Sequence, residues 1–155
     1  MLEWGAKKSG LVPILLDGKQ VATVDPEFWR EGAELVIAGQ TWQFAREGRD
    51  RVARLTSRAG AQPVVLRARR KSFFSQAWLV EGEGAHYEIG PKSFFTSRQH
   101  VLRDGQRVGT GDKVSFWRGR ATLDLDPSVP PVHQVFLLWI SHIIRRRAEA
   151  AAASN

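Results

Sequence analysis

Arginines are the residues best suited to chemistry in this chain, and they gather in two neighbouring stretches. The denser stretch is Arg67-Ala-Arg-Arg-Lys71, and the stretch before it carries Arg49, Arg51, Arg54 and Arg58. Guanidinium groups bind phosphate through paired hydrogen bonds, and lysine adds a point charge. If the two stretches form adjoining hairpins, they could hold a multivalent phosphate. The candidate residues for such an anionic-headgroup site are Arg51, Arg54, Arg67, Arg69, Arg70 and Lys71.

The solvated outer face of a strand is the alternative interpretation of these arginines. Val64, Leu66 and Ala68 alternate with Arg67 and Arg69, as in a strand with one apolar face and one wet face. The apolar positions would then build a core, and the arginines would serve solubility. The sequence leaves both interpretations open.

A second basic group, Arg145, Arg146 and Arg147, follows an apolar segment near the C-terminus. These residues could lie against an anionic membrane surface, where each charge contributes on the order of 1 kcal/mol. They could equally complement the partial negative charge at the end of a helix. We therefore treat them as membrane-proximal candidates.

The remaining polar residues form no catalytic or metal-binding motif. His133 and His142 lie nine positions apart, which places them on opposite sides of a helix. The serines lack a nucleophile-elbow context, and neither a His-Glu-x-x-His motif nor a phosphate loop is present. Asp124 and Asp126 precede Pro127, where turn capping is the expected role. We predict a noncatalytic protein without a metal or other cofactor.

Composition restricts the class of partner. The chain has 155 residues, a formal net charge of +7 and no cysteine. This length suits a single domain spanning residues 1–155, and the charge favours polyanions: anionic lipid headgroups, acidic proteins or nucleic acid. The N-terminal residues do not resemble a secretory signal. We expect a cytoplasmic protein that could associate peripherally with a membrane.

Short β-type runs separated by turn signals fill residues 11–125 and predict about a dozen antiparallel strands. Many antiparallel strands with one wet face favour a closed barrel or a sandwich. The expected strands are residues 11–16, 20–24, 34–38, 41–47, 51–56, 63–69, 73–80, 86–89, 94–103, 107–108, 113–117 and 121–125.

Two internal repeats accompany these strands. Residues 17–35 recur, with one insertion, as residues 104–123, and both copies begin with Asp-Gly and contain Phe-Trp-Arg. This pattern indicates a duplicated hairpin within one barrel, because a solenoid needs three or more units. Lys-Ser-Phe-Phe at 71–74 also recurs at 92–95, and chance similarity is an equal explanation for that short pair.

The pattern changes after the proline-rich connector at residues 126–131. Proline favours the first turn of a helix, so we expect a helix over about 131–147 and an Ala-rich tail over 148–155 that frays or extends it. Apolar residues cover most sides of residues 132–144, which predicts burial all round. A span of a bilayer needs about 20 such residues, so this segment is too short to cross one comfortably.

Together, these features resemble the tubby-like superfamily, which includes LURP-one-related proteins and phospholipid scramblases. The resemblance covers about residues 11–147 and depends on the two Asp-Gly hairpins, Tyr87-Glu-Ile89, Phe116-Trp117 and the apolar segment 132–144. It implies a mainly β fold, a closed antiparallel barrel of about twelve strands threaded by the hydrophobic C-terminal helix. Members of the superfamily are associated with phosphoinositide binding or lipid movement, so the resemblance implies a lipid headgroup as ligand. The chain has no cysteine cluster and no oxygen-rich calcium loop, so scramblase activity is not carried over.

The predicted function is therefore a binding or scaffold module that recognises an anionic phospholipid headgroup or a protein partner through its arginine-rich face. A nucleic-acid-binding module is the alternative, with the same cations and exposed aromatic rings stacking on bases. Trp29 and Trp117 occupy equivalent repeat positions, which favours core packing over stacking for these two rings.

Overall fold

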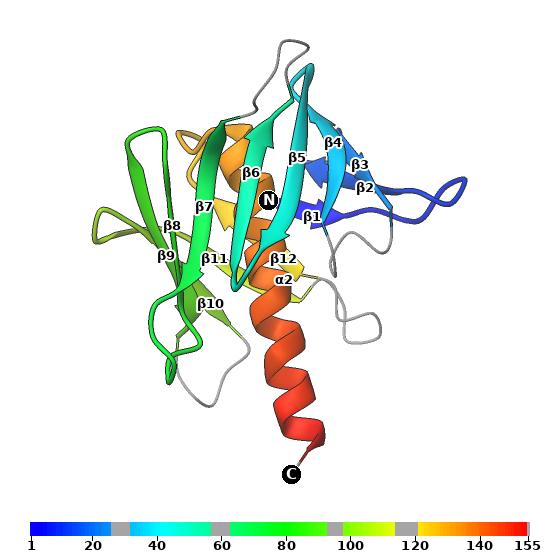
Figure 1. The fold of residues 1–155 in the computed structure, drawn as a ribbon. Coiled ribbons are helices and arrows are strands. Elements are labelled where there is room, and N and C mark those ends of the chain that lie inside the picture. Colours follow the sequence, from blue (N-terminus) through cyan, green and yellow to red (C-terminus); the bar gives the residue numbers. More distant parts are fainter. Residues whose placement is uncertain (26–31, 57–62, 93–97, 114–120, 155) are drawn as a thin grey trace.

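The protein folds into a mainly β structure in which antiparallel strands form a nearly closed barrel around one C-terminal helix (Figure 1). The structure is a computed structural model that describes residues 1–25, 32–56, 63–92, 98–113 and 121–154. The predicted barrel and helix are both confirmed. The elements are β1 (Leu2–Trp4), β2 (Val12–Leu16), β3 (Lys19–Val24), β4 (Gly32–Ile37), β5 (Gln40–Glu47), β6 (Asp50–Leu55), β7 (Val64–Arg70), β8 (Trp78–Gly82), β9 (Ala85–Pro91), β10 (Gln99–Arg103), β11 (Gln106–Lys113), β12 (Ala121–Leu125) and α2 (Pro131–Ala153).

The strands form one 12-stranded sheet in the order β3-β2-β1-β12-β11-β10-β9-β8-β7-β6-β5-β4. Nearly all neighbours are consecutive in the chain, so the sheet is a series of hairpins. The exception is the pairing of β1 with β12, which joins the N-terminal strands to the end of the series. The edge strands β3 and β4 approach each other closely, and this brings the barrel near closure.

Three details of the predicted strands were wrong. Strand β1 was missed, and residues 73–77, expected to open a strand, form a turn before β8. The separate strands expected at 107–108 and 113–117 were also wrong, because residues 106–113 form one continuous strand, β11, while residues 114–117 lie outside the described residues. Its glycines masked that continuity: a Cβ on Gly109 would lie 2.5 Å from the Asp124 carbonyl oxygen on β12, so the close approach of these backbones requires glycine.

The two copies of the long repeat share their hairpin geometry. Asp17-Gly18 and Asp104-Gly105 both have positive φ at both turn positions, as in the tight turns that connect twisted strands. The register also shifts at the same place before each turn, between Ile14 and Leu15 and between Val101 and Leu102. The Trp29 and Trp117 halves of the repeat lie outside the described residues.

Helix α2 runs through the barrel and leaves it at one end, with its C-terminal part projecting beyond the strands (Figure 1). It begins at Pro131, as predicted, but continues to Ala153, so most of the Ala-rich tail is helical. Nine consecutive residues, 133–141, are buried, which means that every face of this stretch is enclosed. Phe136 and Trp139 pack on Phe44 of β5 at ring-centroid distances of 5.3 and 5.8 Å. Each such buried side chain stabilises the fold by roughly 1.5–3 kcal/mol.

Candidate functional site

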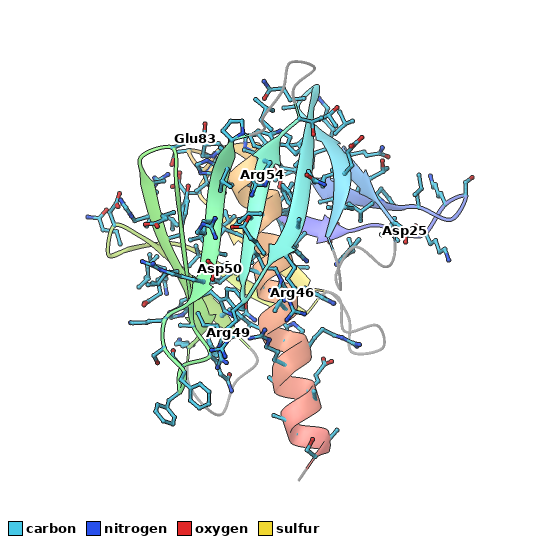
Figure 2. The ribbon with its side chains drawn as sticks, in the orientation of Figure 1. Asp25, Arg46, Arg49, Asp50, Arg54 and Glu83 are labelled. Atoms are coloured by element: carbon cyan, nitrogen blue, oxygen red, sulfur yellow. The ribbon has the colours of Figure 1, made fainter. Side chains whose placement is uncertain are left out.

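A basic pocket of about 600 Å³ lies at the end of the barrel from which α2 emerges. Five arginines and a single carboxylate line it, and we call it the arginine pocket. Its residues are Arg46, Arg49, Asp50, Arg69, Arg70, Ser72, Phe73 and Arg147. Figure 2 shows Arg46 and Arg49 near this end, whereas Glu83 lies at the opposite end of the barrel.

Strand alternation turns part of this set toward the barrel interior. Arg46 follows the buried Phe44 by two positions on β5 and so shares its inward face. Arg51 of β6 lies opposite Arg46, and Arg70 of β7 lies opposite the buried Trp78 of β8. Because opposite residues of paired strands point to the same face, these arginines form the inner rim of the barrel mouth.

The buried ring of Trp78 lies close to two of the cations. The guanidinium carbon of Arg147 lies 5.2 Å from its ring centroid, and that of Arg51 lies 5.7 Å away. Both distances permit attraction between a cation and the ring face. Helix α2 therefore brings Arg147 to the same aromatic surface as the strand residue Arg51.

Positive charge in this region is poorly compensated. Burial lowers the pKa of Arg51 to about 10, and repulsion by Arg147 and Arg46 adds to the effect. Partial burial, with repulsion from Arg70 and Arg46, also lowers the pKa of Arg147. With a pKa of about 10, Arg51 stays charged at neutral pH, and the positive charges repel one another across this region.

The outer face of the same strands carries an ion-pair network. Arg67 donates to Glu47 at 2.8 Å and to Asp50 at 2.9 Å, and Arg54 donates to the second oxygen of Glu47. These bonds, with Arg67 first, hold the pKa of Glu47 below its ordinary value. Bonds to Glu47 and Asp50 raise the pKa of Arg67. We call Glu47, Asp50, Arg54 and Arg67 the outer network.

The structure thus distributes the predicted headgroup residues over several environments. Arg69 and Arg70 line the arginine pocket, whereas Arg54 and Arg67 belong to the outer network. Lys71 pairs with Glu88 of β9. Arg51 is 6 % exposed and lies behind the pocket, where it donates to the Asp50 carbonyl oxygen at 3.2 Å. Arg58, which the sequence grouped with them, lies outside the described residues.

The three C-terminal arginines also separate. Arg147 lines the pocket, Arg146 is exposed, and Arg145 is 4 % exposed, buried in the barrel. Burial lowers the pKa of Arg145 despite the attraction of Asp112 and Glu149. Only Arg147 therefore joins the strand arginines, and it does so because a helix places residues 145 and 147 on different sides.

Sequence reasoning missed Arg46, Asp50, Ser72 and Phe73 as pocket residues. A signal for Arg46 exists in the alternation Trp42, Phe44, Arg46, which continues the inward face of β5 to its end. The lining by Phe73 had no such signal, because it depends on the turn that replaces the expected start of a strand.

At the opposite end of the barrel, His133 is held by both of its ring nitrogens. Its Nδ1 lies 2.8 Å from the Tyr87 hydroxyl and its Nε2 lies 2.8 Å from a Glu83 carboxylate oxygen. This histidine is 3 % exposed, and the two bonds fix the first turn of α2 to β9 and to the β8–β9 turn. A structural role accounts for it fully.

The part of the chain that the structure describes contains neither a metal-ligand cluster nor a helix that could cross a membrane. There, acidic and histidine side chains do not gather in groups of three that could hold a metal ion. In the same ranges, no helix is both long enough and apolar enough to cross a membrane. Comparisons with protein-family models, curated proteins and solved structures found no match for this chain.

Proposed function

We propose that the protein is a noncatalytic module that binds the phosphate groups of an anionic phospholipid headgroup in the arginine pocket. The observation that carries this proposal is the lining itself: five arginines surround a hollow of about 600 Å³ that contains one carboxylate. Asp50, that carboxylate, already accepts a hydrogen bond from Arg67 on the outer face.

A multivalent phosphate fits the chemistry of this lining. Each guanidinium can donate two parallel hydrogen bonds to phosphate oxygens, and several guanidinium groups together can neutralise more than one phosphate. Binding would also relieve the repulsion among Arg46, Arg70 and Arg147. Pockets of roughly 300–1,000 Å³ hold small ligands, so the pocket has room for a phosphorylated sugar ring.

The resemblance to the tubby-like superfamily supports the same ligand class. A nearly closed twelve-stranded barrel around a buried C-terminal helix is the architecture that the resemblance implies. Phosphoinositide binding, which is associated with that superfamily, requires a cationic pocket of this kind. Membership of the superfamily is part of the proposal.

The nucleic-acid alternative has less support. A base-stacking surface needs exposed aromatic rings beside the cations. Among the described residues, Trp4, Trp42, Trp78 and Trp139 are all buried, so the exposed rings beside the cations are Phe73 and Phe74, and two adjacent rings on one turn offer only a small stacking surface. A protein partner carrying an acidic segment would use the same cations and is separated from a lipid by experiment.

Calorimetric titration with inositol trisphosphate, a soluble phosphorylated headgroup, tests the proposal. Arg46→Gln/Arg147→Gln removes two pocket charges and leaves Arg70, which bonds to the adjoining turn. Arg103→Gln/Arg107→Gln is a control with the same net charge, because these residues flank the β10–β11 turn, away from the pocket strands. We expect at least tenfold weaker binding for the pocket variant and less than a twofold change for the control.

Each other outcome counts against the proposal. Equal losses in the two variants would mean that binding follows net charge, and the site would be wrong. Absence of binding to the wild-type protein at physiological salt would reject the phosphate ligand. Preference for a single-stranded oligonucleotide, with a steep dependence on salt, would favour the nucleic-acid alternative.

A further inference from the structure

The turn between β7 and β8 extends from the rim of the arginine pocket and is internally bonded. The Lys71 amide donates to the Ala77 carbonyl oxygen at 2.9 Å, and the Ser75 amide donates to the Ser72 carbonyl oxygen at 3.3 Å. Arg70 Nη2 donates to the carbonyl oxygens of Phe73 and Ser75 at 3.2 and 2.9 Å. A pocket arginine therefore helps to fix the backbone of this turn.

Two phenylalanines at the tip of this turn face solvent. Phe73 is 77 % exposed and Phe74 is 93 % exposed, and their rings meet edge to face at 5.2 Å. The other strongly exposed large apolar residues in the described ranges are Met1, which precedes β1, Leu11, which precedes β2, and Val36 on β4. Single exposed apolar residues are ordinary on protein surfaces, but an adjacent aromatic pair on an ordered turn is a candidate docking feature.

The position of the pair identifies its occupant. The β7–β8 turn and the projecting part of α2 lie at the same end of the barrel (Figure 1), and Phe73 itself lines the arginine pocket. Cations beside protruding aromatic rings match the layering of an anionic bilayer, in which phosphates lie directly above the hydrocarbon. A soluble phosphate would complement the cations and leave both rings in water.

We propose that Phe73 and Phe74 insert into the bilayer interface while the adjoining arginine pocket holds a phospholipid headgroup. This inference rests on the proposed function and narrows its ligand to a lipid in a membrane. The barrel would then dock with the end from which α2 emerges facing the membrane. The exposed Arg146 lies at this end and would add attraction to the anionic surface.

Paired measurements on Phe74→Ser test the insertion, because Phe74 is 93 % exposed and does not line the arginine pocket. Cosedimentation is measured with phosphatidylcholine vesicles that contain a phosphorylated phosphatidylinositol, and calorimetry is repeated with inositol trisphosphate. We expect at least tenfold weaker vesicle binding and less than a twofold change in soluble-ligand affinity. Val36→Ser, which also removes one exposed apolar side chain, should match the wild-type protein in both measurements.

The two measurements separate this inference from the proposed function. Unchanged vesicle binding by the phenylalanine variant would overturn the insertion while leaving the pocket intact. A tenfold loss of soluble-ligand affinity in that variant would overturn it too, because the Phe74 ring would then serve the pocket. If the wild-type protein bound neither ligand, the proposed function would fail first.

A fluorescent label reports on insertion directly. The chain has no cysteine, so Phe74→Cys provides a unique attachment point for a polarity-sensitive dye. We expect a blue shift and enhanced emission when anionic vesicles are added. The same dye on Val36→Cys should not respond. Equal responses at the two positions, or no response at position 74 with bound vesicles, would overturn the proposed orientation.

Discussion

The two faces of strands β5–β7 hold arginines in opposite electrostatic situations. On the outer face, Arg67 contacts two carboxylates, Glu47 and Asp50, and its pKa rises. At the inner rim, burial lowers the pKa of Arg51 to about 10, and repulsion by Arg147 and Arg46 contributes to the decrease. One step along a strand is enough to move an arginine from the first situation to the second.

This difference shows why the number of arginines is a poor guide to a binding site. The outer network satisfies its own charges, so an incoming anion would have to compete with carboxylates that are already bonded. The arginine pocket has cations in excess and an accessible hollow of about 600 Å³. The better guide to a candidate site is therefore the ratio of cations to nearby carboxylates around the hollow, which Arg69 of the outer face and Arg70 of the inner face both line.

Replacement of Trp139 should cause the largest loss of stability, because this side chain belongs to the core on which strands β5–β7 pack. Trp139 is fully buried, and its ring centroid lies 5.8 Å from that of Phe44 on β5. The guanidinium carbon of Arg51 lies 6.0 Å from the centroid of the Trp139 ring. Trp139→Asp buries a charge at a cost of at least about 3 kcal/mol beyond the lost packing. We expect the protein to unfold, with loss of the cooperative thermal transition in circular dichroism.

The matched control is Ala150→Asp, which places the same charge on the exposed part of α2. This variant should retain its cooperative transition. A Trp139→Asp protein that stayed folded and lost only vesicle binding would mean that α2 is an external anchor. The placement of α2 inside the barrel would then be wrong.

Neutralising one arginine of the outer network or one of the arginine pocket should change the free energy of unfolding less than Trp139→Asp does. The two changes should differ in direction. Arg67→Gln removes both ion pairs of that side chain and should lower the free energy of unfolding by at most about 1 kcal/mol. Arg46→Gln relieves repulsion on Arg51 and Arg147, so it should leave that free energy unchanged or raise it slightly.

Urea denaturation at low ionic strength measures this difference between the two variants. High salt should bring them together, because screening weakens exposed pairs and exposed repulsion alike. Equal destabilisation by the two substitutions at low salt would mean that Arg46 is compensated, and the comparison between the faces would break down.

The smallest expected effect is the loss of stability on acidification, which involves the outer network through Glu47. Hydrogen bonds from Arg67 and Arg54 lower the pKa of Glu47 below 4.5 in the folded protein. The stability that Glu47 contributes is thus present above pH 4.5 and is lost as the pH falls through the folded pKa. Glu47→Gln should therefore show a smaller loss of stability on acidification than the wild-type protein.

Denaturation between about pH 6 and about pH 3 measures this difference. Burial lowers the pKa of His142 to about 3, so this histidine also makes the fold less stable as the pH falls below 6.5. Its contribution is common to both proteins and cancels in the comparison. Parallel pH profiles for the two proteins would remove Glu47 from the outer network.

The sequence contained enough local information to predict most of the architecture. Asp-Gly pairs mark two tight hairpins, and the apolar residues around all sides of 132–144 require an enclosed helix. Strand β1 escaped prediction because three residues carry little pattern, and pairing with β2 and β12 stabilises it instead. The continuity of β11 was not predicted because its glycines are required by the close approach of the neighbouring strand β12, which no local pattern reveals.

The candidate site was predictable only as a collection of arginines. Their division between two faces depends on partners distant in sequence, such as Glu47 for Arg67, 20 residues apart. Arg147 joins the pocket because α2 threads the barrel with one particular rotation. Pairing register and helix rotation are tertiary properties, so no local pattern around Arg46 or Arg147 could reveal their proximity.

The threading of α2 has a consequence for biosynthesis. Phe136, Leu137 and Trp139 fill the centre of a barrel whose strands all precede them in the chain. Every strand must therefore leave the ribosome before its apolar face can find the helix that covers it. We expect the nascent strands to expose their inner faces throughout synthesis, so that the final collapse occurs after residues 131–144 have emerged and chaperones can guard the chain until then.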